Sequence, residues 1–167
     1  NKEMSFIKKQ LGVRDAKGEC TKKVIEAILP SSFNYVEQVL LGIVSDMPDP
    51  RDPASSEKVC VALLSLLRAT EGKAFVLFTS YALLHTVVEA IQQELRAVGI
   101  TVLRQGEQAR HVVLEEVKRD THSVLFATDS FWQGVDVRGE SLSNVFIVRL
   151  PFAVPDHPLI EARVEAI

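Results

Sequence analysis

The sequence predicts an α/β fold in which a mainly parallel sheet is flanked by helices on both faces. Short apolar runs alternate along the chain with amphipathic stretches of helical periodicity. The runs are apolar throughout, as strands are when both faces of a sheet are covered. The stretches between the runs are long enough to hold the helix that joins two parallel strands. We expect the 167 residues to form a single domain.

The first third of the chain contains the weaker patterns. Residues 4–11 and 21–28 are short amphipathic stretches, and the mostly apolar segment 37–46 predicts a first strand. Residues 47–56 contain three prolines, so we expect a loop there. Ser55 or Ser56 is expected to cap the helix that follows.

The rest of the chain alternates regularly between helix and strand. An apolar stripe that includes Val59 and Leu63 predicts a helix ending near Gly72. In the last predicted helix, the expected inner stripe is Ala109, Val113 and Val117. After the first helix, the expected elements are strand 73–79, helix 81–98, strand 100–105, helix 107–119, and strands 123–128 and 144–150.

Composition and charge exclude several classes of protein. With 47% hydrophobic and 25% charged residues, the chain has the balance of a globular protein. Its net charge of -3 does not indicate nucleic-acid binding, although a local groove can still bind a polyanion. No run of about 18 apolar residues is present, so we expect no membrane contact and a cytoplasmic location. Cys20 and Cys60 are too few for a zinc or iron–sulfur site and are expected to be reduced, structural thiols.

Local motifs for catalysis are absent. The Gly72-Lys73 pair lacks the flanking residues of a phosphate-binding loop, since Leu67 and Ala74 stand where glycine and serine or threonine are required. No G-x-G-x-x-G, G-x-S-x-G or H-E-x-x-H pattern occurs. We therefore expect no catalytic residue and no metal site in this chain.

Polar turns follow three of the predicted strands, where ligands bind in open parallel sheets. They are Thr79-Ser80, Gln105-Gly106 and Thr128-Asp129-Ser130. Hydroxyls and unpaired N–H groups at helix starts bind phosphate, so two such turns can hold successive phosphates; alternatively, each hydroxyl only caps a helix. Asp129 is expected to shape the loop by accepting backbone N–H groups. Asp136, close after Gly134, suits a ribose hydroxyl or an arginine.

Several segments together resemble a known family. They are "LFTSY" (77–81), "ATDSFWQGVDVRGESL" (127–142) and "VRLPFAVPDHPLIEAR" (148–163), with "LGV" (11–13), "SSFNY" (31–35) and "SDMPDP" (45–50) in matching order. They closely resemble the DinG branch of the XPD/Rad3-like superfamily-two DNA helicases. The resemblance covers nearly the whole chain, and the "TDSFWQGVDV" block is the most specific part.

The resemblance implies a three-layer RecA-like (P-loop NTPase-like) domain. In that family, two RecA-like domains clamp ATP and Mg²⁺ between them and move along single-stranded DNA. The first domain carries the Walker motifs and, in many members, an iron–sulfur cluster. Residues 1–167 resemble the second domain alone, ending before the motif VI "Q-x-x-G-R" segment. We therefore expect the chain by itself to bind no cofactor.

Individual roles follow from the matching motifs. "FTSY" resembles motif IV and "ATDSFWQGVDV" resembles motif V, in which many relatives carry glutamate in place of Gln133. Trp132 is expected either to stack on a base or to anchor the turn, and Arg149 either to contact phosphate or nucleotide or to be structural. The residues expected at the DNA are Thr79, Ser80, Tyr81, Gln105, Thr128, Asp129, Ser130 and Trp132. Those expected to link the DNA to the nucleotide cleft are Gln133, Gly134, Asp136 and Arg149.

These observations favour an ATP-dependent DNA helicase as the parent protein, with single-stranded DNA and the first RecA-like domain as partners. The isolated chain is expected to be inactive. A second hypothesis is the helicase-like half of an exonuclease fusion, which binds DNA without unwinding it. A third is an α/β binding or scaffolding module, in which altering Thr128 or Asp136 would affect only stability.

Overall fold

The computed structural model describes residues 7–8, 11–13, 25, 27–128, 131, 133–137, 139–152 and 162. The chain divides into two compact units, Asn1–Ile43 and Val44–Ile167. The first unit contains the short helix α2, Tyr35–Gln38. The predicted helical patterns at 4–11 and 21–28 lie largely outside the described residues.

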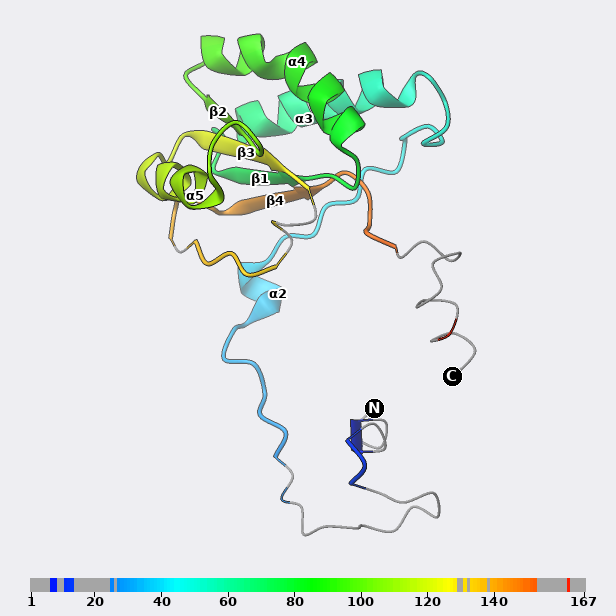
Figure 1. The fold of residues 1–167 in the computed structure, drawn as a ribbon, viewed down its shortest axis with the longest axis vertical. Coiled ribbons are helices and arrows are strands. Elements are labelled where there is room, and N and C mark those ends of the chain that lie inside the picture. Colours follow the sequence, from blue (N-terminus) through cyan, green and yellow to red (C-terminus); the bar gives the residue numbers. More distant parts are fainter. Residues whose placement is uncertain are drawn as a thin grey trace. The chain divides into compact units, whose positions relative to one another are not determined.

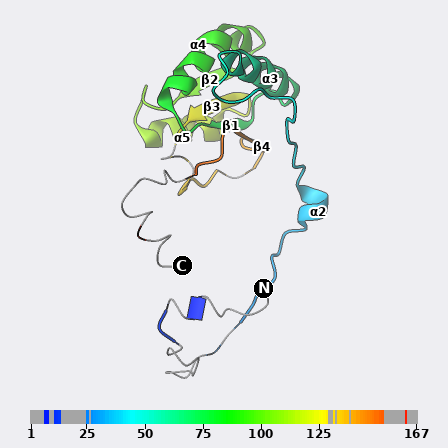
Figure 2. The ribbon, with the colours of Figure 1, turned by 90° about the vertical axis from the view of Figure 1, so that its right-hand side faces the viewer.

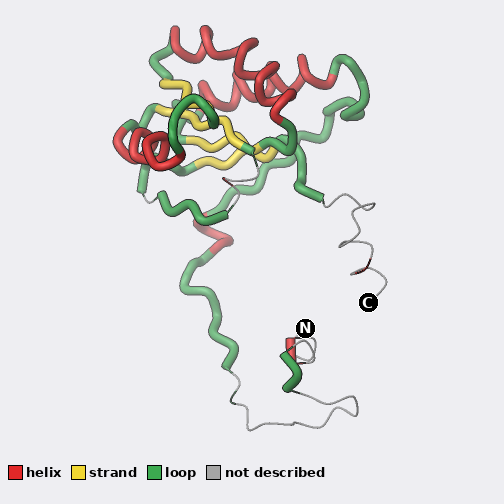
Figure 3. Tube along the Cα trace, viewed as in Figure 1, coloured by secondary structure: helices red, strands yellow, loops and turns green. Residues whose placement is uncertain are grey.

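The second unit contains a parallel sheet between helices (Figures 1 and 3). Its four strands are hydrogen-bonded in the order β2-β3-β1-β4, and every pairing is parallel. The three-layer α/β arrangement expected of a RecA-like domain is therefore confirmed. The elements are α3 Ser55–Ala69, β1 Ala74–Leu77, α4 Tyr81–Ala97, β2 Thr101–Arg104, α5 Arg110–Arg119, β3 Ser123–Ala127 and β4 Asn144–Ile147.

Both faces of the sheet are covered by a hydrophobic core. On one face, strand residues such as Val76 and Phe126 pack with buried residues of α3 and α4. These two helices lie together on one side of the sheet in Figure 2. On the other face, Phe75 and Leu125 pack with Val113 and Val117 of α5. Because neighbouring strand residues point to opposite faces, β1 and β3 are buried at every position, which explains why both are apolar apart from Ser123, whose hydroxyl donates to the Asp120 carbonyl oxygen.

The register of the strands brings the polar turns to one edge. Leu77, the last residue of β1, pairs with Ala127, the last residue of β3. Arg104, at the end of β2, pairs with Phe126. Parallel strands share their direction, so the three polar turns all leave the sheet at its carboxyl edge, next to one another.

A tight turn leads from α3 into β1 at the opposite edge. Glu71, Gly72 and Lys73 all have positive φ angles, of 56°, 77° and 51°. A Cβ atom on Gly72 would lie 2.9 Å from the carbonyl oxygen of Ser123. Only glycine fits this position without a shift of the neighbouring strand.

Three local predictions are wrong. Residues 39–46 form no strand, and their apolar side chains, such as Leu40 at 97%, are exposed, because apolar composition does not by itself supply a neighbouring strand. Helix α3 begins at Ser55 without a side-chain cap, after a turn in which the Asp52 carboxylate accepts the Ala54 N–H at 2.8 Å. Ala109 lies at the N-cap of α5 and is exposed, since the helix begins one residue later than its stripe indicated.

Candidate nucleic-acid interface

A chain of hydrogen bonds connects the polar turns at the carboxyl edge. The side-chain oxygen of Gln105 accepts the Thr128 N–H at 2.6 Å and the Thr128 hydroxyl at 3.1 Å. Because a backbone N–H can only donate, the amide oxygen of Gln105 must face Thr128. Its amide nitrogen then donates to the Tyr81 hydroxyl at 2.5 Å. Gln105 therefore links residues that follow three adjacent strands.

The linked residues differ in their access to solvent. Tyr81 is 51% exposed, whereas Thr128 is only 5% exposed. The Thr128 hydroxyl therefore lies inside the edge, where its contact with Gln105 fixes the start of the following loop. Thr79 is exposed at the same edge. Direct contact of any of these residues with DNA stays a prediction.

Two helices begin at this edge and make it favourable for anions. Helix α4 follows β1 and α5 follows β2. Their first turns, both fully described, contain no acidic residue, so nothing there neutralises the partial positive charge of the helix start. Ser80 is the N-cap of α4, and its hydroxyl accepts the Leu83 N–H at 3.5 Å. Ser80 therefore caps a helix, which was the alternative to phosphate binding for the hydroxyls of the polar turns.

Two arginines that were not predicted from the sequence lie at this edge. Arg110, the first residue of α5, donates through Nη2 to the carbonyl oxygens of Gln133 and Gly134, both at 3.1 Å. Arg104 pairs with Glu107 at 2.7 Å and contacts His85 Nδ1 at 3.2 Å. A positive charge at the start of a helix is unfavourable for the helix dipole. An arginine in the first turn of a predicted helix therefore could have indicated from the sequence that Arg110 has another role.

Residues 133–137, in the loop that follows β3, alternate between exposed and half-buried, because Val135 and Val137 pack against the core. Gln133, Gly134 and Asp136 all face solvent. Gly134 has a φ angle of 68°, which explains why glycine is present there. Arg149 donates to the carbonyl oxygen of Pro50 at 3.1 Å, a contact expected of a structural arginine. Its role at a nucleotide stays a prediction.

Three of the predicted DNA-binding residues, Asp129, Ser130 and Trp132, lie outside the described residues. The structure therefore leaves both interpretations of Trp132 open, either base stacking or anchoring of the turn.

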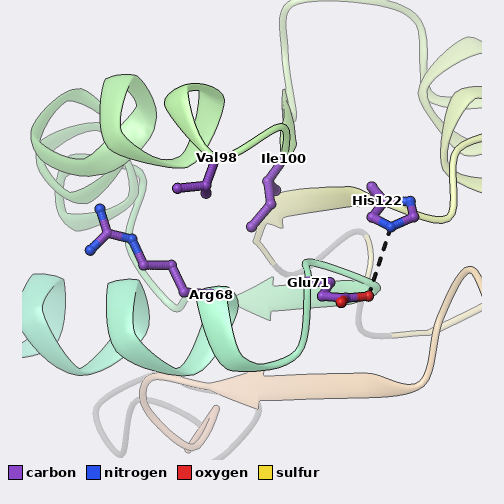
Figure 4. Close-up of a pocket in the computed structure, with 5 residues that line it drawn as sticks. All are labelled: Arg68, Glu71, Val98, Ile100 and His122. Carbon is purple, nitrogen blue, oxygen red and sulfur yellow. Dashed lines mark ion pairs between the residues drawn. The ribbon is translucent and has the colours of Figure 1, made fainter.

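A pocket lies at the opposite, amino-terminal edge of the sheet (Figure 4). Its volume is about 420 Å³. Glu71 Oε2 and His122 Nε2 lie 3.8 Å apart on one side of it. The lining residues are Arg68, Glu71, Val98, Ile100 and His122. This pocket is separate from the polar turns, which leave the other end of the strands.

The described parts of the chain contain no group of three histidine, cysteine, aspartate or glutamate side chains able to hold a metal ion. Among the helices that the structure describes, none has both the length and the apolar character needed to cross a bilayer. Cys60 packs against the core, and burial raises the pKa of its thiol. This thiol is therefore neutral near pH 7, as a structural cysteine would be.

Comparison with known proteins gives consistent matches. Residues 63–167 match the family described as "Helicase C-terminal domain". The chain is 41% identical over 140 residues to "ATP-dependent DNA helicase YoaA" of Haemophilus influenzae, covering 84% of this chain and 21% of the relative. It is 36% identical over 138 residues to "ATP-dependent helicase DinG" of Mycobacterium tuberculosis, covering 82% and 20%. It is 33% identical over 142 residues to "3'-5' exonuclease DinG" of Bacillus subtilis, covering 82% and 15%.

The chain thus spans between 15% and 21% of the length of these curated relatives. The family match covers more than half of the chain and includes the whole carboxyl edge of the sheet described above. The chain therefore belongs to the helicase C-terminal domain family and is a DinG-type, XPD/Rad3-like member of it, as its motifs predicted.

Proposed function

We propose that the protein containing this chain is an ATP-dependent DNA helicase of the DinG type and that this chain is its second motor domain. The observation that carries the proposal is the hydrogen-bonded chain from Tyr81 through Gln105 to Thr128. It unites turns from three adjacent strands at the one edge of the sheet where ligands bind. Relatives named as ATP-dependent DNA helicases support the same assignment.

The DNA would bind through its backbone. Two helix starts without acidic residues attract phosphate groups, and the exposed Thr79 and Tyr81 add hydroxyl donors beside them. Such contacts do not depend on base sequence, which suits a motor that moves along a strand. Thr128 would act from inside the edge by holding the entry to 129–130. Asp129, Ser130 and Trp132 are assigned to the DNA by their motif positions.

The nucleotide would bind between this chain and a first RecA-like domain. Gln133, Gly134, Asp136 and Arg149 are assigned to that cleft by their motif positions. ATP hydrolysis is phosphoryl transfer to water, which needs a phosphate-binding loop and Mg²⁺. This chain contains no such loop, so these parts, and any iron–sulfur cluster, are assigned to the first domain. Half of a cleft cannot hold the reacting groups in place, and the chain alone should not hydrolyse ATP. The cytoplasm is the proposed location.

The test uses the full-length protein. ATP turnover is measured with and without single-stranded DNA, and a variant of the Walker lysine in the first domain serves as the inactive control. We expect turnover to rise on adding DNA and the isolated chain to show none. DNA binding should weaken steeply as salt rises, because each neutralised phosphate releases counterions. Turnover that single-stranded DNA does not stimulate would reject the helicase assignment.

A second function is favoured by one comparison. The Bacillus subtilis relative is named a 3'-5' exonuclease, so the parent protein could pair a nuclease with a helicase-like half that only binds DNA. The two functions separate on a labelled partial duplex with a single-stranded tail. A helicase releases an intact strand when ATP is added, whereas the exonuclease shortens the strand from its 3' end without ATP.

A further inference from the structure

Arg110 connects helix α5 to the loop that follows β3. From the first turn of α5, its guanidinium contacts three residues of that loop, Phe131, Gln133 and Gly134. The Arg110 Cζ atom lies 5.3 Å from the ring centroid of Phe131. Its Nη2 donates to the carbonyl oxygens of Gln133 and Gly134 at 3.1 Å each. We infer that Arg110 is a positioning residue that holds this loop in the shape that links DNA binding to ATP turnover. The inference rests on the proposed function.

The start of the loop is fixed by the core. Phe131 is 4% exposed and packs in the same hydrophobic cluster as Val113 and Val117 of α5. Beyond Phe131 the loop is exposed at Gln133 and Gly134, so burial does not hold it there. Two hydrogen bonds from Arg110 hold the backbone of Gln133 and Gly134. Arg110 therefore holds the exposed backbone that lies between Phe131 and Val135, two residues that pack against the core.

The chemistry requires an arginine. A planar guanidinium can lie over an aromatic ring while its N–H groups donate in the guanidinium's own plane, which a lysine ammonium does not reproduce. The C=O and N–H groups of a trans peptide unit point in opposite directions. Holding the carbonyls of Gln133 and Gly134 toward Arg110 therefore turns the N–H groups of Gly134 and Val135 away from α5. Adjacent backbone N–H groups turned the same way suit an anionic group such as a phosphate.

The position of Arg110 gives it a role in coupling. It is the first residue of α5 and follows Gln105, the residue after β2, by five residues. Gln105 holds Thr128 at the DNA side of the loop, while Arg110 holds residues 133 and 134 at the nucleotide side. The two contacts hold the same loop at two points, one at its start and one at residues 133 and 134. Replacing Arg110 should leave DNA binding intact, but the bound DNA should no longer stimulate ATP turnover.

The experiment compares full-length wild-type protein with three variants. Arg110→Gln removes the charge and the fork of donors, and Arg110→Lys keeps the charge alone. Arg119→Gln is the matched control, since Arg119 is exposed in the last turn of the same helix. For each protein we measure ATP turnover with saturating oligo-dT, turnover without DNA, and the Kd of labelled oligo-dT without nucleotide.

Arg110→Gln should lower DNA-stimulated kcat at least tenfold, while the oligo-dT Kd stays within twofold of wild type. The DNA-stimulated kcat of Arg110→Lys should lie between those of wild type and Arg110→Gln. That of Arg119→Gln should match wild type. Normal stimulation in Arg110→Gln overturns the inference. A parallel loss of oligo-dT affinity also overturns it, because Arg110 would then contact the DNA directly.

Amide hydrogen exchange separates this inference from the proposed function. In Arg110→Gln, exchange over residues 133–137 should become at least tenfold faster, while exchange in β1 and β3 stays unchanged. If wild-type turnover does not respond to DNA, the proposed function fails. The exchange result then still decides whether Arg110 holds the loop, and an unchanged rate over 133–137 would show that it does not.

Discussion

Replacing Gln105 with leucine should destabilise the domain and loosen the carboxyl edge of the sheet. Leucine is similar in size to glutamine but cannot accept a hydrogen bond. The substitution removes the acceptor of the Thr128 N–H, which lies 2.6 Å from the Gln105 oxygen, and of the Thr128 hydroxyl. It also removes the donor to Tyr81.

The magnitude follows from the burial of each partner. Thr128 is 5% exposed, so water cannot replace the lost acceptor, and an unsatisfied buried donor costs about 1–3 kcal/mol. The Thr128 hydroxyl can rotate toward another acceptor and adds little. Tyr81 is 51% exposed and regains a hydrogen bond from water. The expected loss of unfolding free energy is therefore about 1–3 kcal/mol in total.

The assay is urea unfolding followed by circular dichroism. With an m-value of about 2 kcal/mol per molar, the midpoint should fall by about 0.5–1.5 M. Gln93→Leu is the control, because Gln93 is exposed in the middle of α4, and its substitution should change stability by less than about 0.5 kcal/mol. Gln105→Glu keeps an acceptor for Thr128 and should lose less than Gln105→Leu.

A loss in Gln105→Leu no larger than in the Gln93→Leu control would refute this reasoning. It would mean that the Thr128 N–H finds another partner and that Gln105 does not organise the edge. Equal losses in Gln105→Leu and Gln105→Glu would show that the acceptor is not the group that matters.

Two further predictions concern the turn before β1. Gly72→Ala should lower the free energy of unfolding by at least about 1 kcal/mol more than the control Gly99→Ala, because the Cβ at residue 72 would meet the Ser123 carbonyl oxygen. Gly99→Ala should cost about 1–2 kcal/mol for its left-handed backbone alone. Equal urea midpoints of the two variants would contradict this prediction. A hydrogen bond from Lys73 holds the pKa of Glu71 below its ordinary value of 4.5. The stability that this contact contributes is present above pH 4.5 and is lost as the pH falls through the lowered pKa. In carboxyl NMR titrations the Glu71 midpoint should lie below 4.5 and should rise in Lys73→Met; an unmoved midpoint would exclude Lys73 as the cause.

The sequence by itself determined the fold class and the edge that carries the candidate site. A strand buried on both faces is apolar along nearly its whole length, and β1 and residues 124–127 of β3 show this in the sequence and in the structure. Parallel strands joined by helices must end at a common edge, so polar residues that follow successive strands, such as Thr79 and Thr128, can be placed together before any coordinates exist. These features follow from local patterns of apolar and polar residues, which can be recognised in the sequence alone.

Only the tertiary structure decided which side chains meet at that edge. Gln105 contacts Thr128, which is 23 residues away in sequence, because β2 lies beside β3, and the strand order is not written in any one segment. Arg110 reaches Gly134 across 24 residues for the same reason. The apolar segment 39–46 shows the converse, since it has the composition of a buried strand but forms none. A strand and a hydrogen-bonded site both depend on a neighbour, and the choice of neighbour is made by the packing of the whole domain.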